Sequence, residues 1–200
     1  MRVCICFYGV IGRSLKQTFP SIKTNIFDVL TENNVEFDVY LHNNCINVLR
    51  STRAGETAQQ IDNECWRMLE PVEYICEDQD KAPTNAERFD KEFAHIPDKY
   101  NDNKQSYKFA LYEMYSCKKV TELWKDIKPY DCYLYLRPDL EYLHKIDLQF
   151  IKSCMARSDW NNTIATPCWH NHADEGLNDR IAFGSYDSIL AWGERFDYID

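Results

Sequence analysis

Basic residues are in the minority in this sequence, with 23 lysines and arginines against 32 aspartates and glutamates and a formal net charge of −9. A protein that binds nucleic acid needs a basic face for the phosphates, so this balance argues against that class. No apolar run is long enough to cross a membrane, and the first residues lack the cleavage pattern of a signal peptide. We therefore expect a cytoplasmic protein without a membrane span.

Disulfide chemistry is not indicated, although the chain has nine cysteines. The count is odd, the chain is not small, and no Cys-x-x-Cys pair occurs. Cys4, Cys6 and Cys132 fall inside apolar, strand-like runs, where a thiol behaves as a small hydrophobic group. We predict reduced, structural cysteines.

The short motifs of several enzyme classes are also missing. The sequence has no Gly-x-Ser-x-Gly elbow, no kinase His-Arg-Asp set and no His-Glu-x-x-His zinc motif. The glycine fingerprints of dinucleotide-binding folds and of the P-loop are absent as well. A Cys–His nucleophile pair stays open, but no local motif supports it.

What the sequence does contain is an alternation of strand-like and helix-like segments. Strands are expected over Arg2–Tyr8, Phe37–Leu41, Val72–Cys76, Tyr130–Leu136, Asn162–Pro167 and Ile181–Gly184, and helices over Leu15–Leu30, Thr57–Leu69, Ser106–Ile127, Leu148–Met155 and Ser185–Trp192. No repeat or flexible linker interrupts the alternation. It predicts a single α/β domain over residues 1–200, with a mostly parallel sheet flanked by helices; such a domain is compatible with excision from a longer protein.

The most informative segment is the apolar, aromatic run Tyr130–Leu140, which ends on Arg137, Pro138 and Asp139. Such a run predicts a buried strand that delivers Arg137 and Asp139 to its carboxyl end, where ligands bind in open α/β sheets. A carboxylate suits a divalent metal and a guanidinium suits a phosphate. The alternative is a structural Arg–Asp pair, and this segment alone does not decide between them.

Three further polar clusters follow strands that are expected to run parallel to this one. They are Gly9–Arg13, His42–Asn44 and Asp78–Asp80. Parallel strands bring their carboxyl ends to one edge, so the four clusters should share a crevice. Gly9 and Gly12 permit close approach of a diphosphate, although they could equally just form the turn. Asp139 is the favoured metal ligand and Asp78 the favoured nucleoside contact, with the reverse assignment left open.

A second polar loop, Cys168–Arg180, contains His170, His172, Asp174, Glu175 and Asp179. A structural zinc site is disfavoured because no second Cys or His pair accompanies the histidines, although one histidine could complete a Mn²⁺ shell. Asp179, which precedes an apolar run, is the best candidate for a carboxylate that faces a substrate. Its alternatives are helix capping and a pair with Arg180.

Taken in order, these segments resemble the nucleotide-sugar glycosyltransferases of the GT-A fold, most of all a viral member of that family. The resemblance is carried by Phe7-Tyr8-Gly9-x-x-Gly12-Arg13, Met114–Lys119, Tyr133–Leu140 and Asn178–Ser185. It implies a GT-A-like, Rossmann-like three-layer sandwich and a retaining, metal-assisted transferase. Such an enzyme moves a hexose from a UDP-sugar, of the UDP-glucose or UDP-rhamnose type, to a glycan or glycoprotein acceptor. A viral origin would place it in the host cytoplasm, and we expect a monomer.

The resemblance also implies roles for single residues. Asp139 matches the last carboxylate of the family's Asp-x-Asp motif and would bind Mn²⁺ or Mg²⁺, whereas Arg137 stands where an acid is usual and would hold the diphosphate. The nucleotide-sugar contacts map to Phe7, Tyr8, Gly9, Arg13, Asp78 and Arg137. Asp179 would act on the acceptor hydroxyl or stabilise the oxocarbenium ion. The competing functions are a non-catalytic nucleotide-sugar-binding module and a metal-dependent sugar-nucleotide phosphohydrolase.

Overall fold

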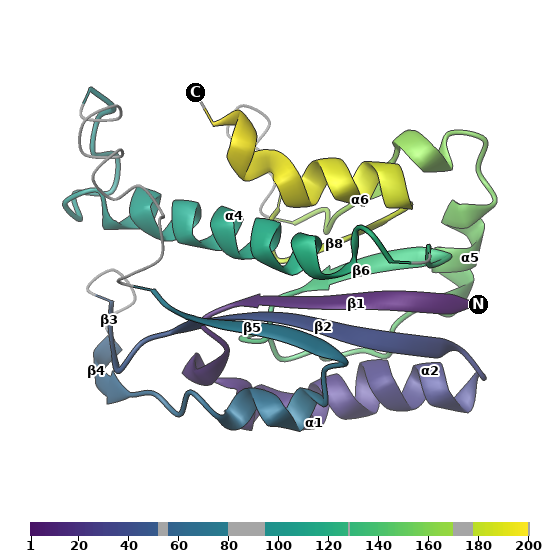
Figure 1. The fold of residues 1–200 in the computed structure, drawn as a ribbon, viewed down its shortest axis with the longest axis horizontal. Helices are drawn as coiled ribbons and strands as arrows, with labels where there is room; N and C mark the ends of the chain where they lie inside the picture. The colour runs from purple at the N-terminus through teal and green to yellow at the C-terminus, as the bar shows by residue number, and fades with distance from the viewer. Residues whose placement is uncertain (52–55, 80–94, 128, 170–177, 200) are drawn as a thin grey trace.

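A six-stranded sheet forms the centre of the computed structural model (Figure 1), which describes residues 1–51, 56–79, 95–127, 129–169 and 178–199. The strands lie side by side in the order β5-β2-β1-β6-β8-β7. Their bounds are β1 (Arg2–Gly9), β2 (Glu36–Cys45), β5 (Glu73–Asp78), β6 (Cys132–Leu136), β7 (Ile164–Ala165) and β8 (Ile181–Gly184). A separate antiparallel ribbon consists of β3 (Val48–Ser51) and β4 (Glu56–Gln60).

Strand direction divides the sheet into two parts. β1 pairs in parallel with β2 and β6, and β2 pairs in parallel with β5. β8 runs antiparallel to both β6 and β7, which makes the sheet mixed. The α/β class and the parallel first four strands are therefore confirmed. Side chains alternate with the same period in both directions, so the sequence pattern could not reveal the reversal of β8.

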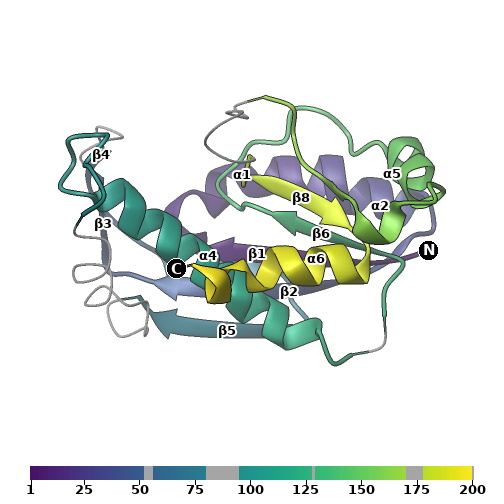
Figure 2. The ribbon, with the colours of Figure 1, turned by 90° about the horizontal axis from the view of Figure 1, so that it is seen from above.

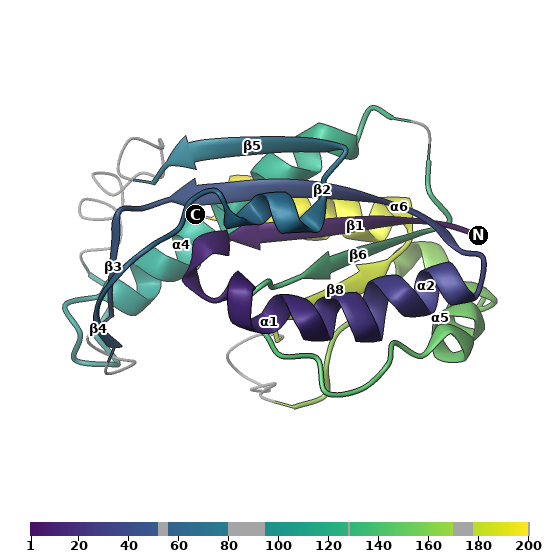
Figure 3. The same ribbon diagram turned by 90° about the horizontal axis from the view of Figure 1, so that it is seen from below.

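Helices cover both faces of this sheet. One face carries a continuous run of α1 (Leu15–Ile22), the π-helical turn η2 (Lys23–Phe27) and α2 (Asp28–Glu32), seen in front of the sheet in Figure 3. The opposite face carries α4 (Gln105–Trp124) and α6 (Tyr186–Gly193), which lie over the sheet in Figure 2. Successive side chains of β1 alternate between these faces, so Phe7 packs with α1 and α2 whereas Tyr8 packs with α4 and α6.

The remaining helical segments are short. They are η1 (Ile11–Arg13), η3 (Cys65–Leu69), α5 (Leu148–Met155), η4 (Trp160–Asn162) and η5 (Glu194–Tyr198). The predicted helices near α4, α5 and α6 are confirmed to within a few residues. The strand predicted over Asn162–Pro167 shrinks to the two residues of β7.

The helix predicted over Thr57–Leu69 is wrong. β4 and the 3-10 turn η3 occupy this range instead. Ile61, Cys65 and Leu69 are spaced like one face of a helix, and all three are buried. The spacing thus identified the buried positions, but the backbone at the start of the range pairs with β3 rather than with itself.

The two glycines of the first loop differ in what they require. Gly9 has a φ of 98°, which side chains other than glycine rarely adopt. At Gly12 an added Cβ would overlap Ile61 and come within 2.6 Å of the carbonyl oxygen of Asp62. Both glycines are therefore needed to build the turn, whatever else the loop binds.

We expect Gly12→Ala to lower the free energy of unfolding by about 1–3 kcal/mol, because the backbone at Asp62 cannot move aside as a flexible side chain could. Urea denaturation measures the loss. Ser14→Ala in the same loop is the control, since the Ser14 side chain makes no capping hydrogen bond and its loss should change the free energy little. Equal stability of the two variants would contradict the prediction.

Candidate functional site

A cavity of about 580 Å³ opens at the carboxyl ends of β1, β2 and β6. β1 lies between β2 and β6, so the sheet extends away from it in two directions at this point. Ligands of open α/β sheets bind at such switch points. The walls come from the loop after β1 (Gly9, Arg13), the end of β2 (Asn44), the segment after β6 (Arg137, Asp139), the residue Asp179 before β8, and the residues from Tyr100 to Glu113 at the start of α4.

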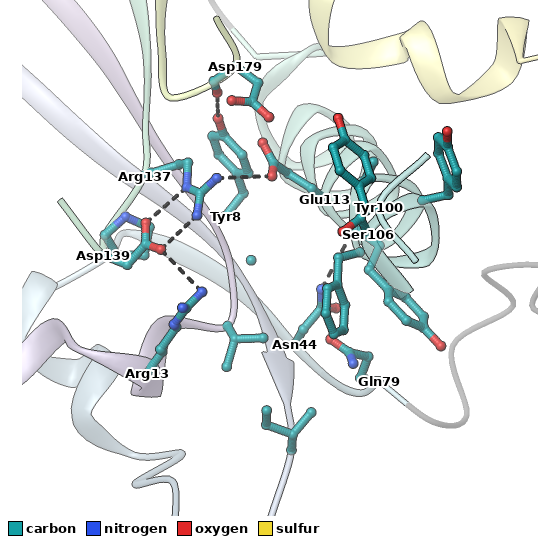
Figure 4. Close-up of a pocket in the computed structure, with 18 residues that line it drawn as sticks. Tyr8, Arg13, Asn44, Gln79, Tyr100, Ser106, Glu113, Arg137, Asp139 and Asp179 are labelled. Carbon is teal, nitrogen blue, oxygen red and sulfur yellow. Dashed lines mark hydrogen bonds and ion pairs between the residues drawn. The ribbon is translucent and has the colours of Figure 1, made fainter. Parts of the chain in front are cut away.

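Arg137 and Asp139 form a two-pronged ion pair at one end of the cavity (Figure 4). Arg137 Nε donates to Asp139 Oδ1 over 2.9 Å, and Nη2 donates to Oδ2 over 2.7 Å. Arg13 Nη1 lies 3.7 Å from the same Oδ2. Burial alone would raise the pKa of Asp139, but the hydrogen bonds and charge of Arg137, with the charge of Arg13, lower it below the usual value. Asp139 is therefore an anion held between two guanidinium groups.

Glu113 on α4 contacts the charged cluster formed by Arg13, Arg137 and Asp139. Its Oε2 accepts a hydrogen bond from Arg137 Nη1 over 3.2 Å. Burial, opposed by the charges of Arg137 and Arg195 and aided by the neighbouring Asp179, raises the pKa of Glu113 to about 8. Sequence reasoning missed this residue. The signal was present, since Glu113 stands one helical turn before the buried Ser116 and Cys117 and so lies on the inner face of α4.

Asp179 is brought to the cavity by its neighbours. The Tyr8 hydroxyl donates to the Asp179 carbonyl oxygen over 2.6 Å, which joins the end of β1 to this segment. The buried Asn178 donates to the Trp169 carbonyl over 2.7 Å and accepts from the Arg180 amide. The Arg180 guanidinium lies 5.2 Å from the centre of the Trp169 ring. The Asp179 carboxylate faces Glu113 across the cavity wall (Figure 4).

The opposite wall of the cavity is aromatic. It includes Tyr100, Tyr107, Phe109 and Tyr112, and Figure 4 shows Tyr100 across the cavity from Arg13 and Asp139. The turn before α4 holds this wall, because Asp98 accepts hydrogen bonds from the amides of Asp102 and Lys104. This turn contains three residues with positive φ, two of them asparagines, which adopt that conformation more often than most residues other than glycine. The spacing of these aromatic residues along the sequence did not predict that they line a cavity.

A buried hydrogen-bond relay fixes the first loop from behind. The Gly9 amide donates to Ser116 Oγ over 2.7 Å, and Ser116 Oγ lies 2.7 Å from His42 Nδ1. His42 Nε2 lies 3.4 Å from Glu77. A Ser–His–Glu series can belong to a hydrolase, but Ser116 and His42 are fully buried here. Burial also lowers the pKa of His42 to about 4, so the imidazole is neutral and the relay is a structural support.

The structure brings together most of the residues that the sequence predicted. Six line the cavity: Tyr8, Gly9, Arg13, Arg137, Asp139 and Asp179. Phe7 does not, because the alternation along β1 turns its side chain into the core on the other face of the sheet. Asp78 ends β5 without lining the cavity, and its neighbour Gln79 takes that position. The predicted ligands Asp80, His170, His172, Asp174 and Glu175 lie outside the described residues.

Asp139, the carboxylate predicted to bind a metal, is paired with arginines in the structure. Both oxygens of Asp139 contact guanidinium groups, which carry the same charge sign as a metal ion. Within the described ranges, no group of three or more His, Cys, Asp or Glu side chains could hold a metal ion. The donors that the structure describes therefore do not fit Mn²⁺ or Mg²⁺ at Asp139 in this arrangement.

Comparison with known proteins yields no relative, because no family model, curated protein or solved structure matches this chain. Across the part of the chain that the structure describes, no helix combines the length and apolarity needed to cross a membrane.

Proposed function

We propose that this protein is a GT-A-type glycosyltransferase that moves a hexose from a UDP-sugar to a hydroxyl of a glycan or glycoprotein acceptor. One observation carries the proposal: a single cavity at the switch point of the sheet has two arginines at one end, an aromatic wall opposite, and a carboxylate between them. The parallel arrangement of β5, β2, β1 and β6, with helices on both faces, supports the same fold family.

The two ends of the cavity suit the two ends of a nucleotide. The guanidinium groups of Arg13 and Arg137 match the oxygens of a diphosphate, and the amino end of α1 adds partial positive charge nearby. The aromatic rings at Tyr100, Tyr107 and Phe109 offer a surface on which a base can stack. A volume of about 580 Å³ falls in the usual range for ligand sites.

Sugar transfer needs a group that stabilises the departing UDP and a group that accepts the proton of the acceptor hydroxyl. Cleavage of the sugar–phosphate bond leaves its electron pair on UDP, and Arg13 and Arg137 stabilise that charge. The acceptor hydroxyl loses its proton as its oxygen bonds to the sugar, and the Asp179 carboxylate takes that proton. Transfer by way of Mn²⁺ on Asp139 stays a prediction, and none of these steps depends on it.

Calorimetric titration of UDP-glucose into the protein tests the donor class, once with Mn²⁺ and once with excess EDTA, with GDP-mannose as control. We expect heat of binding from UDP-glucose and none from GDP-mannose. Binding only with Mn²⁺ would confirm the predicted metal, and binding in EDTA would leave Asp139 as a partner of the arginines. No binding in either condition would refute the proposal.

Product analysis separates transfer from the two competing functions. A glycosyltransferase forms a glycoside when an acceptor is present, whereas a phosphohydrolase releases free sugar without one. A binding module retains the UDP-sugar unchanged. Chromatography of the products with and without an added glycan acceptor distinguishes the three.

A further inference from the structure

Two carboxyl groups meet at the wall of the cavity. The Asp179 side chain approaches that of Glu113 from a different element, and its charge helps to raise the pKa of the Glu113 carboxyl group. The two carboxyl groups face each other in Figure 4. Glu113 Oε2 accepts a hydrogen bond from Arg137. Glu113 Oε1 is buried and has no hydrogen-bond partner among the described residues. Two ionised carboxylates that face each other repel, whereas a proton on one of them lets it donate a hydrogen bond to the other.

The surroundings decide which group carries that proton. The Glu113 side chain is only 18% exposed and lies on the inner face of α4. The groups that face it are Arg137 after β6, Asp179 before β8, Tyr8 on β1 and Arg195 on η5. Burial and Asp179 oppose ionisation and the two arginines favour it, and the balance raises the pKa of Glu113 to about 8.

A proton on Glu113 affects how much of the positive charge of Arg137 remains for a ligand. Asp139 already offsets one positive charge at this end of the cavity, through bonds to Arg137 and a contact with Arg13. An ionised Glu113 would place a second carboxylate on Arg137 and leave little positive charge for a diphosphate. A neutral Glu113 avoids this, and its hydroxyl can donate to Asp179.

We propose that Glu113 is a positioning residue that works in its protonated form, orienting the Asp179 carboxylate while leaving the charge of Arg137 available to the diphosphate. This role rests on the proposed transfer reaction. In that reaction the acceptor O–H bond breaks and its proton passes to Asp179. The acceptor oxygen bonds to the anomeric carbon, and the sugar–phosphate bond breaks with its electrons on UDP. Glu113 keeps its own proton throughout.

Glu113→Gln tests the role, because an amide mimics a protonated carboxyl group. Its NH₂ can donate to Asp179 and its carbonyl can accept from Arg137. We expect kcat/KM of Glu113→Gln to stay within about threefold of the unmodified protein near pH 7. The activity of the unmodified protein should decline above about pH 8 as Glu113 ionises, and that decline should be absent in Glu113→Gln.

Glu113→Ala is the contrasting variant, since it removes the hydrogen bond to Arg137 and the proposed one to Asp179. Its kcat/KM should fall by about 10- to 100-fold, the size of loss seen when a group that orients a metal ligand is removed. Loss of activity in Glu113→Gln equal to that in Glu113→Ala would overturn the proposal, and so would an unchanged alkaline decline.

A measurement that needs no substrate keeps this test separate from the proposed function. The pKa of Glu113 rises from an ordinary 4.5 to about 8 on folding, so its stabilising effect is complete below pH 4.5 and disappears as the pH rises towards 8. The free energy of unfolding should therefore fall less steeply between pH 5 and pH 8 in Glu113→Gln. Parallel profiles would overturn the protonated state even if UDP-glucose binds. A flatter profile without UDP-glucose binding would refute only the proposed function.

Discussion

Asp179→Asn is expected to abolish sugar transfer while leaving UDP-sugar binding within about twofold of the unmodified protein. The amide cannot take the proton of an acceptor hydroxyl, and proton transfer to a positioned side chain contributes about 10²–10⁴-fold to rate. Binding should persist because the contact from Tyr8 goes to the backbone carbonyl of residue 179, which the substitution keeps. Transfer rate and calorimetric affinity, measured on the same preparation, check both parts.

The control for this substitution is Asp187→Asn. Asp187 lies on the exposed side of the first turn of α6 and does not line the cavity. Its replacement should leave transfer and binding unchanged. Equal loss of transfer and binding in Asp179→Asn would remove the assigned role, since it would show that the carboxylate holds the donor rather than the acceptor.

Arg137→Met is expected to weaken UDP-sugar binding by at least about 100-fold and to lower the free energy of unfolding by about 3 kcal/mol. The substitution removes the guanidinium proposed to bind the diphosphate. It also leaves the Asp139 carboxylate, 16% exposed, without its two-pronged partner and with the longer contact to Arg13. A buried carboxylate that loses its partner is strongly destabilising. Calorimetry and urea denaturation measure the two effects.

The chain supplies a matched control for Arg137→Met. Arg157 and Asp159 have the same two-residue spacing and the same two-pronged geometry, with bonds of 2.8 and 2.7 Å, but their side chains are 57% and 51% exposed. Arg157→Met should therefore cost less than about 1 kcal/mol and leave binding unchanged.

A double variant separates stability from binding. Arg137→Met with Asp139→Asn removes the unpaired buried charge, so it should recover part of the lost stability but none of the lost binding. Recovery of UDP-sugar binding in this variant would show that Arg137 serves only to neutralise Asp139. That outcome would favour the structural Arg–Asp pair over a phosphate site.

Much of the sheet could be predicted from local pattern. The apolar run before Arg137 predicted a buried strand, and all five residues of β6 are buried. The polar clusters after β1 and β6 could be predicted to meet, because parallel neighbours end at one edge of a sheet. The prediction of a helix over Thr57–Leu69 was wrong because helical spacing of apolar residues also occurs in segments that are not helical. Ile61, Cys65 and Leu69 mark buried positions, and their helical spacing concealed the pairing of β4 with β3.

The sequence by itself determined which chemical groups reach the carboxyl edge, since strand ends place Tyr8, Gly9, Arg137 and Asp139 there. Only the tertiary structure decided what these groups do to one another. The carboxylate of Asp139 lies against two guanidinium groups, and Glu113 faces Asp179 only because α4 packs across β1 and β2. Charge pairing and protonation depend on distance and burial, which residue spacing along the chain does not encode.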